Sequence, residues 1–381
     1  SVFEVDSRTG ALERIQLVDD LVNPSYLALS ADGAHLYCVH GDHSDVSAFR
    51  VDRASGRLAF VNRQSTEGRN PVHLALDPSG RFLVVTNHIG ASLAVLPVAA
   101  DGPLEPLVQL VSISGPIGPH RVEQQQAKPH FNPFDPSGRW VIVPDKGLDR
   151  VLGYRFDGGR LVAAPTPFAT AREGAGPRSA VFHPSGSIAY VVNELDSTLM
   201  TCRFDASNGE LTPVHVIPTL PATFIGASRA AGIAIDPRGR CVYTSNRGHD
   251  SIATFRLDPA SGLPSLVAAT PTQGRTPRFV TLSPDGRVLF ALNEDSDTIV
   301  AHVTRKYGVR LDDGLSAAQR DTGHLVTRML DDLYWVMSYS RWKDERYWPA
   351  FRDALLREHP RLTNDDLKNA KEFNAKRYHF Q

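Results

Sequence analysis

The 381-residue sequence has few of the features that mark several large classes of protein. Its three cysteines, Cys38, Cys202 and Cys241, are odd in number and far apart, so buried thiols are a simpler interpretation than a disulfide framework. No apolar run reaches membrane-spanning length, and the first twenty residues carry charges where a signal peptide needs an apolar core. We therefore expect a cytoplasmic protein that does not contact membranes.

The chain also lacks an excess of charge and a metal-binding motif. Lys and Arg number 41 against 42 Asp and Glu, which gives no general attraction for nucleic acid. No His-x-x-x-His, Cys-x-x-Cys or Asp-x-Asp-x-Asp pattern occurs, and the glycines do not have phosphate-loop spacing. We expect neither a bound metal nor another cofactor.

A β-hairpin pattern is what the sequence does contain, and residues 177–194 show it most clearly. Two runs of β-branched and aromatic residues flank the turn Pro-Ser-Gly186, which predicts two antiparallel strands. The first strand of such a hairpin begins at the edge of the sheet where the second strand ends. Arg178 and Glu194 are therefore expected to lie close together.

The hairpin recurs along the chain. Six turns of this kind end at Gly33, Gly80, Gly138, Gly186, Gly239 and Gly286, with spacings of 47, 58, 48, 53 and 47 residues. An outer turn follows each inner turn, as in Asp52-Arg-Ala-Ser-Gly56, so each unit has about four strands, the number of a propeller blade. With residues 1–18 as the outer half of a further blade, the repeat predicts an all-β, seven-bladed β-propeller whose last blade is shared between the two ends of the chain; whether this blade closes the ring completely is left open.

The pattern changes near the C-terminus. Val326, Met329, Leu330, Leu333 and Met337 have helical spacing. We therefore expect two parts, a propeller over residues 1–308 and a short α-helical segment over residues 309–381. A helical segment of this size is small for a core of its own, so it would pack on the propeller or mediate self-association.

Two columns of residues mark one mouth of the expected central channel. The residues eight places before each turn glycine are Ser25, Val72, His130, Arg178, Ala231 and Arg278. The residues eight places after it are Gly41, His88, Lys146, Glu194, Arg247 and Glu294. His73 lies one place further into its strand, and Asn246 precedes Arg247.

These columns combine guanidinium, imidazole and carboxylate groups. Guanidinium groups bind carboxylate or phosphate in a bidentate way and are costly to bury without a partner. Ion pairs between neighbouring blades, Arg178 with Glu194 and Arg247 with Glu294, would also explain the charges. The gathering of the whole set at one opening favours a site for an anionic small molecule.

At these positions the sequence resembles the β-propeller lactonase family, which includes propeller-type 6-phosphogluconolactonases and 3-carboxy-cis,cis-muconate lactonizing enzymes. The matching stretches are Asn23-Pro-Ser-Tyr-Leu-Ala-Leu29, Pro129-His130, Gly176-Pro-Arg178 with Val192-Asn-Glu-Leu195, and Ser245-Asn-Arg-Gly-His-Asp-Ser-Ile252. The resemblance implies that His130, Arg178, Glu194 and Arg247 are the catalytic residues. The tail around residues 329–342 resembles part of the helical half of metaxin-like, glutathione-transferase-like proteins.

The expected activity is therefore hydrolysis of an anionic sugar-acid lactone, with 6-phosphogluconolactone as the example. The arginines would hold the anion and the developing oxyanion, and Glu194 or His130 would activate water. Arg278, His73, His88, Lys146 and Asn246 are the expected substrate-binding residues. Two alternatives stay open: cycloisomerisation of a carboxylated muconate at the same site, and a non-enzymatic propeller that binds a partner.

Overall fold

The computed structural model describes residues 1–5, 12–19 and 21–295, together with the isolated positions 352, 353, 363 and 365. The chain divides into two compact units, residues 1–299 and 300–381. The helical segment predicted over residues 309–381 lies outside the described residues, apart from the four isolated positions.

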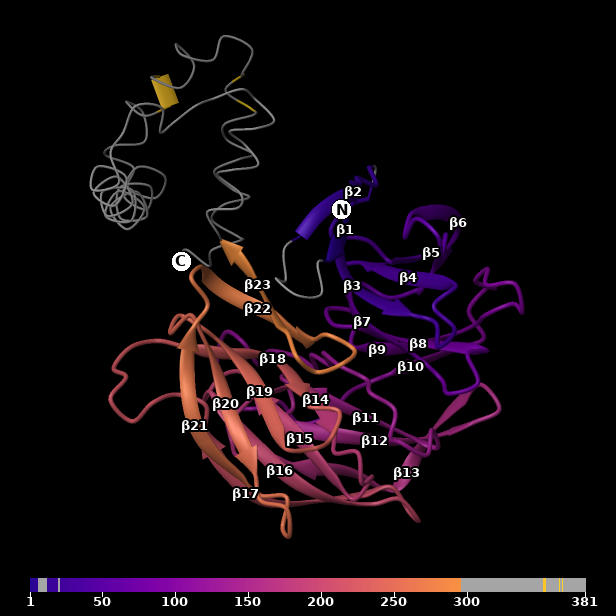
Figure 1. The fold of residues 1–381 in the computed structure, drawn as a ribbon. Coiled ribbons are helices and arrows are strands. Elements are labelled where there is room, and N and C mark those ends of the chain that lie inside the picture. Colours follow the sequence, from indigo (N-terminus) through magenta and orange to yellow (C-terminus); the bar gives the residue numbers. More distant parts are fainter. Residues whose placement is uncertain (6–11, 20, 296–351, 354–362, 364, 366–381) are drawn as a thin grey trace, which may run out of the picture. The chain divides into compact units, whose positions relative to one another are not determined.

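Antiparallel sheets, each formed by strands consecutive in the chain, build the first unit (Figure 1). Four sheets have four strands each: β3 (Pro24–Leu29), β4 (His35–His40), β5 (Asp45–Val51) and β6 (Leu58–Ser65); β7 (Pro71–Leu76), β8 (Phe82–Asn87), β9 (Ser92–Pro97) and β10 (Gln109–Ser112); β14 (Pro177–Phe182), β15 (Ile188–Asn193), β16 (Thr198–Asp205) and β17 (Glu210–Pro218); β18 (Arg229–Ile235), β19 (Cys241–Arg247), β20 (Ser251–Leu257) and β21 (Pro264–Pro271). A fifth sheet has three strands: β11 (Trp140–Asp145), β12 (Arg150–Asp157) and β13 (Arg160–Thr170). Two-stranded sheets stand at either end: β1 (Val2–Val5) with β2 (Leu12–Gln16), and β22 (Arg275–Leu282) with β23 (Leu289–Asp295).

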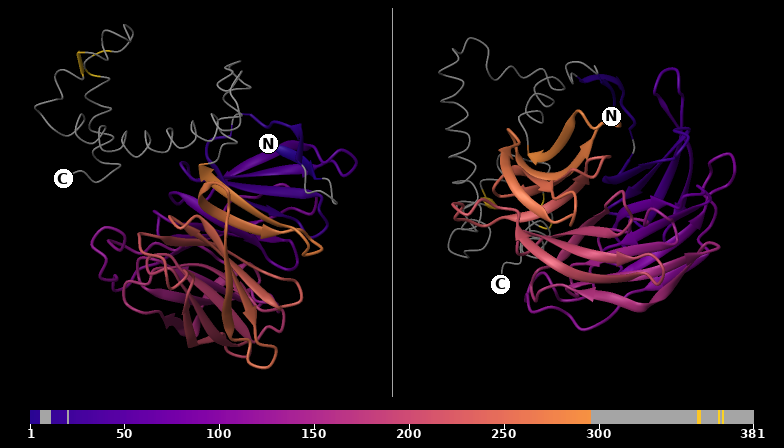
Figure 2. Two further views of the ribbon diagram at one scale, coloured as in Figure 1. Left: turned by 60° about the vertical axis from the view of Figure 1, so that its left-hand side comes forward. Right: turned by 60° about the horizontal axis from the view of Figure 1, so that its bottom comes forward.

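Successive sheets pack through their first strands, β3 on β7, β11 on β14, β14 on β18 and β18 on β22, and Figure 2 shows them following one another around a centre. The predicted all-β propeller fold is therefore confirmed. Five sheets in the described part of the chain have the three or four strands of a blade, so the count of seven blades stays a prediction.

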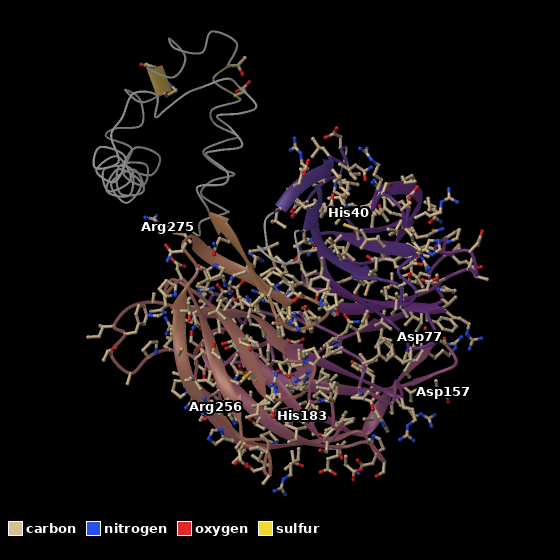
Figure 3. All side chains as sticks on the ribbon, in the orientation of Figure 1. His40, Asp77, Asp157, His183, Arg256 and Arg275 are labelled. Carbon is tan, nitrogen blue, oxygen red and sulfur yellow. The ribbon has the colours of Figure 1, made fainter. Side chains whose placement is uncertain are left out.

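The inner turns have the conformation that their sequence requires. All six turn glycines have φ between 67° and 76°, a region that a side chain makes costly. The first residue of each turn is polar, and its side chain makes hydrogen bonds with the backbone or the side chains of that turn. Asp77 accepts hydrogen bonds from the N–H groups of Ser79 and Phe82, and His183 takes the same place in its hairpin beside Ser185 (Figure 3). His183 is thus a turn residue.

The core lies between neighbouring sheets. Buried aliphatic side chains of β4, β5, β8 and β9 form one cluster, and β15, β16, β19 and β20 form an equivalent one. In each, a buried tyrosine donates a hydrogen bond to a glycine carbonyl: Tyr37 to Gly102 at 2.9 Å and Tyr190 to Gly262 at 2.6 Å. Cys38 and Cys202 are buried in this framework, as expected.

The N-terminal hairpin β1–β2 docks on the outer strand β6. The Gln16 side chain donates to the Leu58 carbonyl at 2.8 Å and accepts from the Leu58 N–H at 2.6 Å. The antiparallel pair β1 and β2 therefore lies beside the first four-stranded sheet, where two outer strands were predicted.

Candidate functional site

A β-bulge recurs in the strands that form the site. In five of the inner hairpins the register shifts at the residue eight places before the turn glycine. The bulged residues are Ser25, Val72, Arg178 and Arg278 in four of them, and Ala231 with Gly232 in the fifth. A bulge leaves the extra residue unpaired and redirects its side chain. Each first strand thereby presents one side chain at the same mouth of the propeller.

The two predicted columns meet in one cavity of about 470 Å³. Nine of their twelve residues line it: Ser25, Gly41, Val72, His88, His130, Lys146, Glu194, Arg247 and Arg278. Arg178 lines the larger cavity described below, and its Nε is 2.9 Å from Glu194 Oε2. The structure therefore brings together the four residues His130, Arg178, Glu194 and Arg247.

Glu194 is the centre of the charge arrangement. Its Oε2 lies 2.9 Å from Arg178 Nε and 3.3 Å from Arg247 Nη2, and its Oε1 lies 3.2 Å from Lys146 Nζ. The Glu194 side chain is 5% exposed, so these contacts are screened little by solvent. Arg178 and Arg247 thus share one carboxylate, whereas the side chain of Glu294, the other predicted partner of Arg247, lies outside the described residues.

Two charged residues at the site were not predicted. Arg229, the first residue of β18, lies 3.7 Å from Glu194 Oε1, and Glu123 bridges Lys146 at 3.0 Å and Arg229 at 2.6 Å. Glu123 lies on the long connection between β10 and β11, and Arg229 directly follows the long connection between β17 and β18. Loop length was the signal that could have found them, because long loops on a rigid scaffold often carry binding residues.

The cluster carries more positive than negative charge. Four cations, Lys146, Arg178, Arg229 and Arg247, surround two carboxylates, Glu123 and Glu194. Burial would raise the pKa of Glu194, but Lys146, then Arg247 and Arg178, outweigh it and hold that pKa far below its usual range. Glu194 is therefore ionised at all pH values of interest, and the surplus positive charge suits an anionic ligand.

His130 is the uncharged member of the site. It is buried, and its Nδ1 makes no hydrogen bond to the described residues. Burial, reinforced by the charge of Arg178, lowers its pKa well below 6.5. The neighbouring His88 ring, 5.2 Å away, bonds the Pro129 carbonyl and has its pKa lowered by burial and Lys146 to about 4. Both imidazoles are neutral at pH 7, so a buried basic nitrogen without a hydrogen-bond partner belongs to this site.

Two predicted substrate-binding residues do not line the cavity, which corrects the expectation. His73 is buried between the rings of Tyr26 and Phe131, and its Nδ1 lies 2.6 Å from Asn132 Oδ1. Asn246 is fully buried and bonds both the hydroxyl and the carbonyl of Thr219. Their hydrogen bonds within the fold explain the polar side chains without a ligand.

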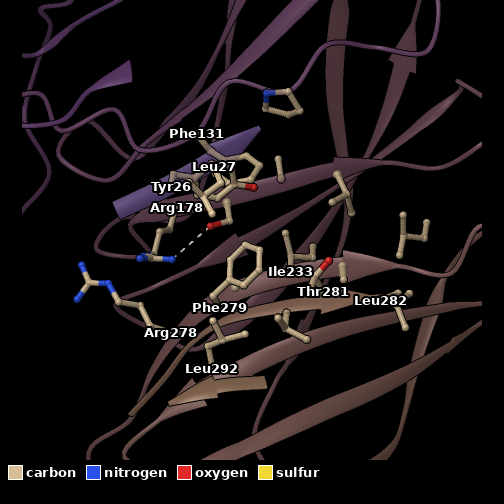
Figure 4. Close-up of a pocket in the computed structure, with 18 of the residues that line it drawn as sticks. Tyr26, Leu27, Phe131, Arg178, Ile233, Arg278, Phe279, Thr281, Leu282 and Leu292 are labelled. Carbon is tan, nitrogen blue, oxygen red and sulfur yellow. Dashed lines mark hydrogen bonds between the residues drawn. The ribbon is translucent and has the colours of Figure 1, made fainter. Parts of the chain in front are cut away.

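A second, larger cavity of about 970 Å³ continues from the first. The two share Pro24, Ser25, Val72, His130 and Arg278. Figure 4 shows Arg178 and Arg278 at one end of this cavity, with the apolar side chains of Ile233 and Leu282 further along. The opening at the propeller centre therefore has a charged end and an apolar end.

Among the residues with described positions, no group of three or more His, Cys, Asp or Glu is arranged to hold a metal ion. The described part of the chain also contains no apolar helix long enough to cross a membrane.

Comparison with known proteins agrees with the propeller fold. The family model described as "Lactonase, 7-bladed beta-propeller" matches residues 1–310. The chain therefore belongs to the β-propeller lactonase family, while residues 311–381 lie outside the match.

Individual relatives lie at about 30% identity. The 6-phosphogluconolactonase of Bacillus subtilis (strain 168) is 33% identical over 301 residues, which cover 78% of this chain and 85% of the relative. The 6-phosphogluconolactonase of Formosa agariphila is 30% identical over 308 residues, covering 78% of this chain and 86% of the relative. Among solved structures, the periplasmic gluconolactonase of Pseudomonas aeruginosa has a TM-score of 0.72 and 31% identity, covering 77% of this chain and 85% of that one.

Proposed function

We propose that the protein is a lactonase that hydrolyses the ester of an anionic sugar-acid lactone, with 6-phosphogluconolactone as the leading substrate. The observation that carries this proposal is a buried neutral histidine, His130, in the same cavity as a cation cluster with more positive than negative charge. The names of the relatives from Bacillus subtilis and Formosa agariphila support the substrate class.

In this proposal His130 is the general base. Its Nδ1 takes a proton from water, and the resulting hydroxide adds to the lactone carbonyl carbon to give a tetrahedral oxyanion. The ring C–O bond then breaks, and the proton held by His130 passes to the departing ring oxygen. Arg247 and Arg278, both in the cavity wall, would stabilise the oxyanion, and Lys146 would hold the anionic substituent.

Glu194 has a different role in this scheme. Its two oxygens are within 3.3 Å of three cations, and its pKa is far below the usual range, so it is a poor proton acceptor. We assign it the task of orienting Arg178 and Arg247. Of the two candidates for activating water, the geometry supports His130.

The test compares two substitutions with the parent protein. His130→Gln and Arg247→Ala should each lower kcat/KM for 6-phosphogluconolactone by about 10²–10³, the usual loss for a general base or an oxyanion donor. Asn208→Ala, in an outer turn, should not change it. Circular dichroism and thermal unfolding would verify the fold. Parent-like hydrolysis by both variants, after subtraction of the spontaneous reaction, would exclude this site.

Cycloisomerisation of a carboxylated muconate would use the same cations on carboxylate groups. Assay of the parent protein with 3-carboxy-cis,cis-muconate distinguishes the two reactions. Turnover of the muconate without turnover of the lactone would assign the protein to the second reaction.

A seven-bladed ring is part of the proposal. The family description gives seven blades, and β1–β2 docks on β6 as the outer half of a further blade would. We also retain self-association through residues 309–381 as a proposal. Sedimentation of the full chain and of a variant ending at residue 308 would test it, because only the full chain should self-associate.

A further inference from the structure

Glu123 is the charged residue at the site whose role the proposed reaction does not explain. It comes from the long connection between β10 and β11, and its side chain is 19% exposed, whereas that of Glu194 is 5% exposed. Its two oxygens contact different cations, Oε1 with Arg229 Nη1 at 2.6 Å and Oε2 with Lys146 Nζ at 3.0 Å. One carboxylate thus bridges an ammonium and a guanidinium group, as a bound carboxylate or phosphate ligand would.

The segment that carries Glu123 is held firmly in place. The neighbouring Gln124 is almost completely buried, and its side chain donates to the Lys146 carbonyl at 2.8 Å and accepts from the His120 N–H at 2.9 Å. The His120 ring accepts from the Glu123 N–H at 3.2 Å. Glu123 is therefore positioned by the fold on Lys146, rather than reaching it by chance from a solvated loop.

Lys146 connects Glu123 to the cavity. Lys146 lines the cavity wall, but Glu123 and Arg229 are not among the lining residues. The Lys146 ammonium is shared by Glu123 at 3.0 Å and Glu194 at 3.2 Å. An anion that enters the cavity and binds Lys146 would share that ammonium group with Glu123 and Glu194, whose negative charges oppose it.

We propose that Glu123 is an internal competitor of the substrate anion and sets the charge that a ligand must have to bind. The proposal rests on the anion site of the proposed function, and Glu123 acts through Lys146, so it is a positioning residue. A phosphate group with nearly two negative charges can displace a single carboxylate from Lys146, whereas a ligand without an anionic substituent gains nothing there. Glu123 would thus weaken the binding of phosphorylated sugar acids more than that of unphosphorylated ones.

Removal of the Glu123 charge tests this idea through ligand-binding measurements, without an activity assay. Glu123→Gln keeps the shape of the side chain and leaves four cations with one carboxylate. Calorimetry should show that the full-length variant binds 6-phosphogluconate and inorganic phosphate about tenfold more tightly than the parent, with a smaller gain for gluconate. Glu105→Gln, an exposed glutamate in the turn before β10, is the matched control and should change nothing.

Further variants separate competition from a merely structural role. Glu123→Asp retains the charge and should bind phosphate as the parent does. The gain from Glu123→Gln should disappear when Lys146→Gln is also present, because the two residues act on one ammonium group. Weaker binding of phosphate to Glu123→Gln, an unchanged affinity, or no phosphate binding by either protein would overturn the proposal.

This result is independent of hydrolysis. If the parent protein binds 6-phosphogluconate and Glu123→Gln binds it more tightly, while neither turns over 6-phosphogluconolactone, the competitor role stands and the proposed reaction is wrong.

Discussion

Substitution of Glu194 by Gln is the most direct test of how the charge cluster is held together. The change removes one negative charge that three cations approach within 3.3 Å, in a place that is 5% exposed. Arg178 would keep its buried guanidinium with hydrogen bonds only to neutral groups such as the Ala231 carbonyl. Breaking a buried ion pair by removing one partner typically costs about 3–5 kcal/mol.

The expected effect is large enough to measure by thermal unfolding. For a unit of this size, 1 kcal/mol corresponds to roughly 2–4 °C, so the Tm of Glu194→Gln should fall by about 6–20 °C at pH 7. Glu105→Gln should leave Tm unchanged. Inorganic phosphate should raise the Tm of Glu194→Gln more than that of the parent, because the variant has cations without a counter-charge.

The pH dependence gives a second check on the same variant. The pKa of Glu194 is lower in the folded protein than in the unfolded chain. The stabilisation by its charge is therefore complete above the unfolded value, about 4.3, and is lost progressively as the pH falls below it toward the folded value. The Tm difference between parent and variant should be constant from about pH 5.5 to 8 and should shrink below about pH 4.5.

A double substitution shows whether the cost comes from the unpaired cation. Glu194→Gln with Arg178→Met removes both partners and should recover much of the lost stability, because the uncompensated buried charge is gone. A Tm for Glu194→Gln within about 1 °C of the parent, or no recovery in the double variant, would refute the reasoning.

Three further predictions concern other parts of the site and the core. Because burial and nearby cations place the pKa of His130 well below 6.5, kcat/KM should be nearly constant from about pH 6 to 8. A plot of kcat/KM against pH that reaches half its maximum at about pH 6.5 or above would exclude His130 as the base. Burial raises the pKa values of Cys38 and Cys202 to about 12, so a thiol reagent at pH 8 should label neither in the folded protein. The half-buried Cys241 should react first. Prompt labelling of all three cysteines would contradict this packing. A Cβ at Gly147 would collide with a backbone oxygen in the connection between β10 and β11. Gly147→Ala should therefore lower the free energy of unfolding by about 1–3 kcal/mol in denaturant and weaken phosphate binding next to Lys146. Parent-like values would show that the connection can shift to make room for the Cβ at little cost.

The repeat in the sequence determined most of the architecture. A turn glycine every 47 to 58 residues, flanked by strand-forming residues, was sufficient to predict the hairpins and the propeller, because turn chemistry and strand alternation are local properties. Counting eight residues to either side of each glycine also identified nine residues of one cavity, since hairpin pairing fixes which positions share a sheet edge.

Only the tertiary structure decided how the charges are shared. Arg178 and Arg247 come from different sheets and converge on one oxygen of Glu194, a distance that depends on bulges and on how neighbouring sheets pack. Glu123 lies on a connection without periodicity and Arg229 directly follows another, so no local pattern could place them on Lys146 and Glu194. His73 and Asn246 carry polar groups suited to a site, yet the direction of each side chain, set by its strand and its neighbours, buries them among structural hydrogen bonds. Local sequence patterns specify which residues reach a sheet edge, whereas the partners they meet there depend on contacts between residues far apart in the chain.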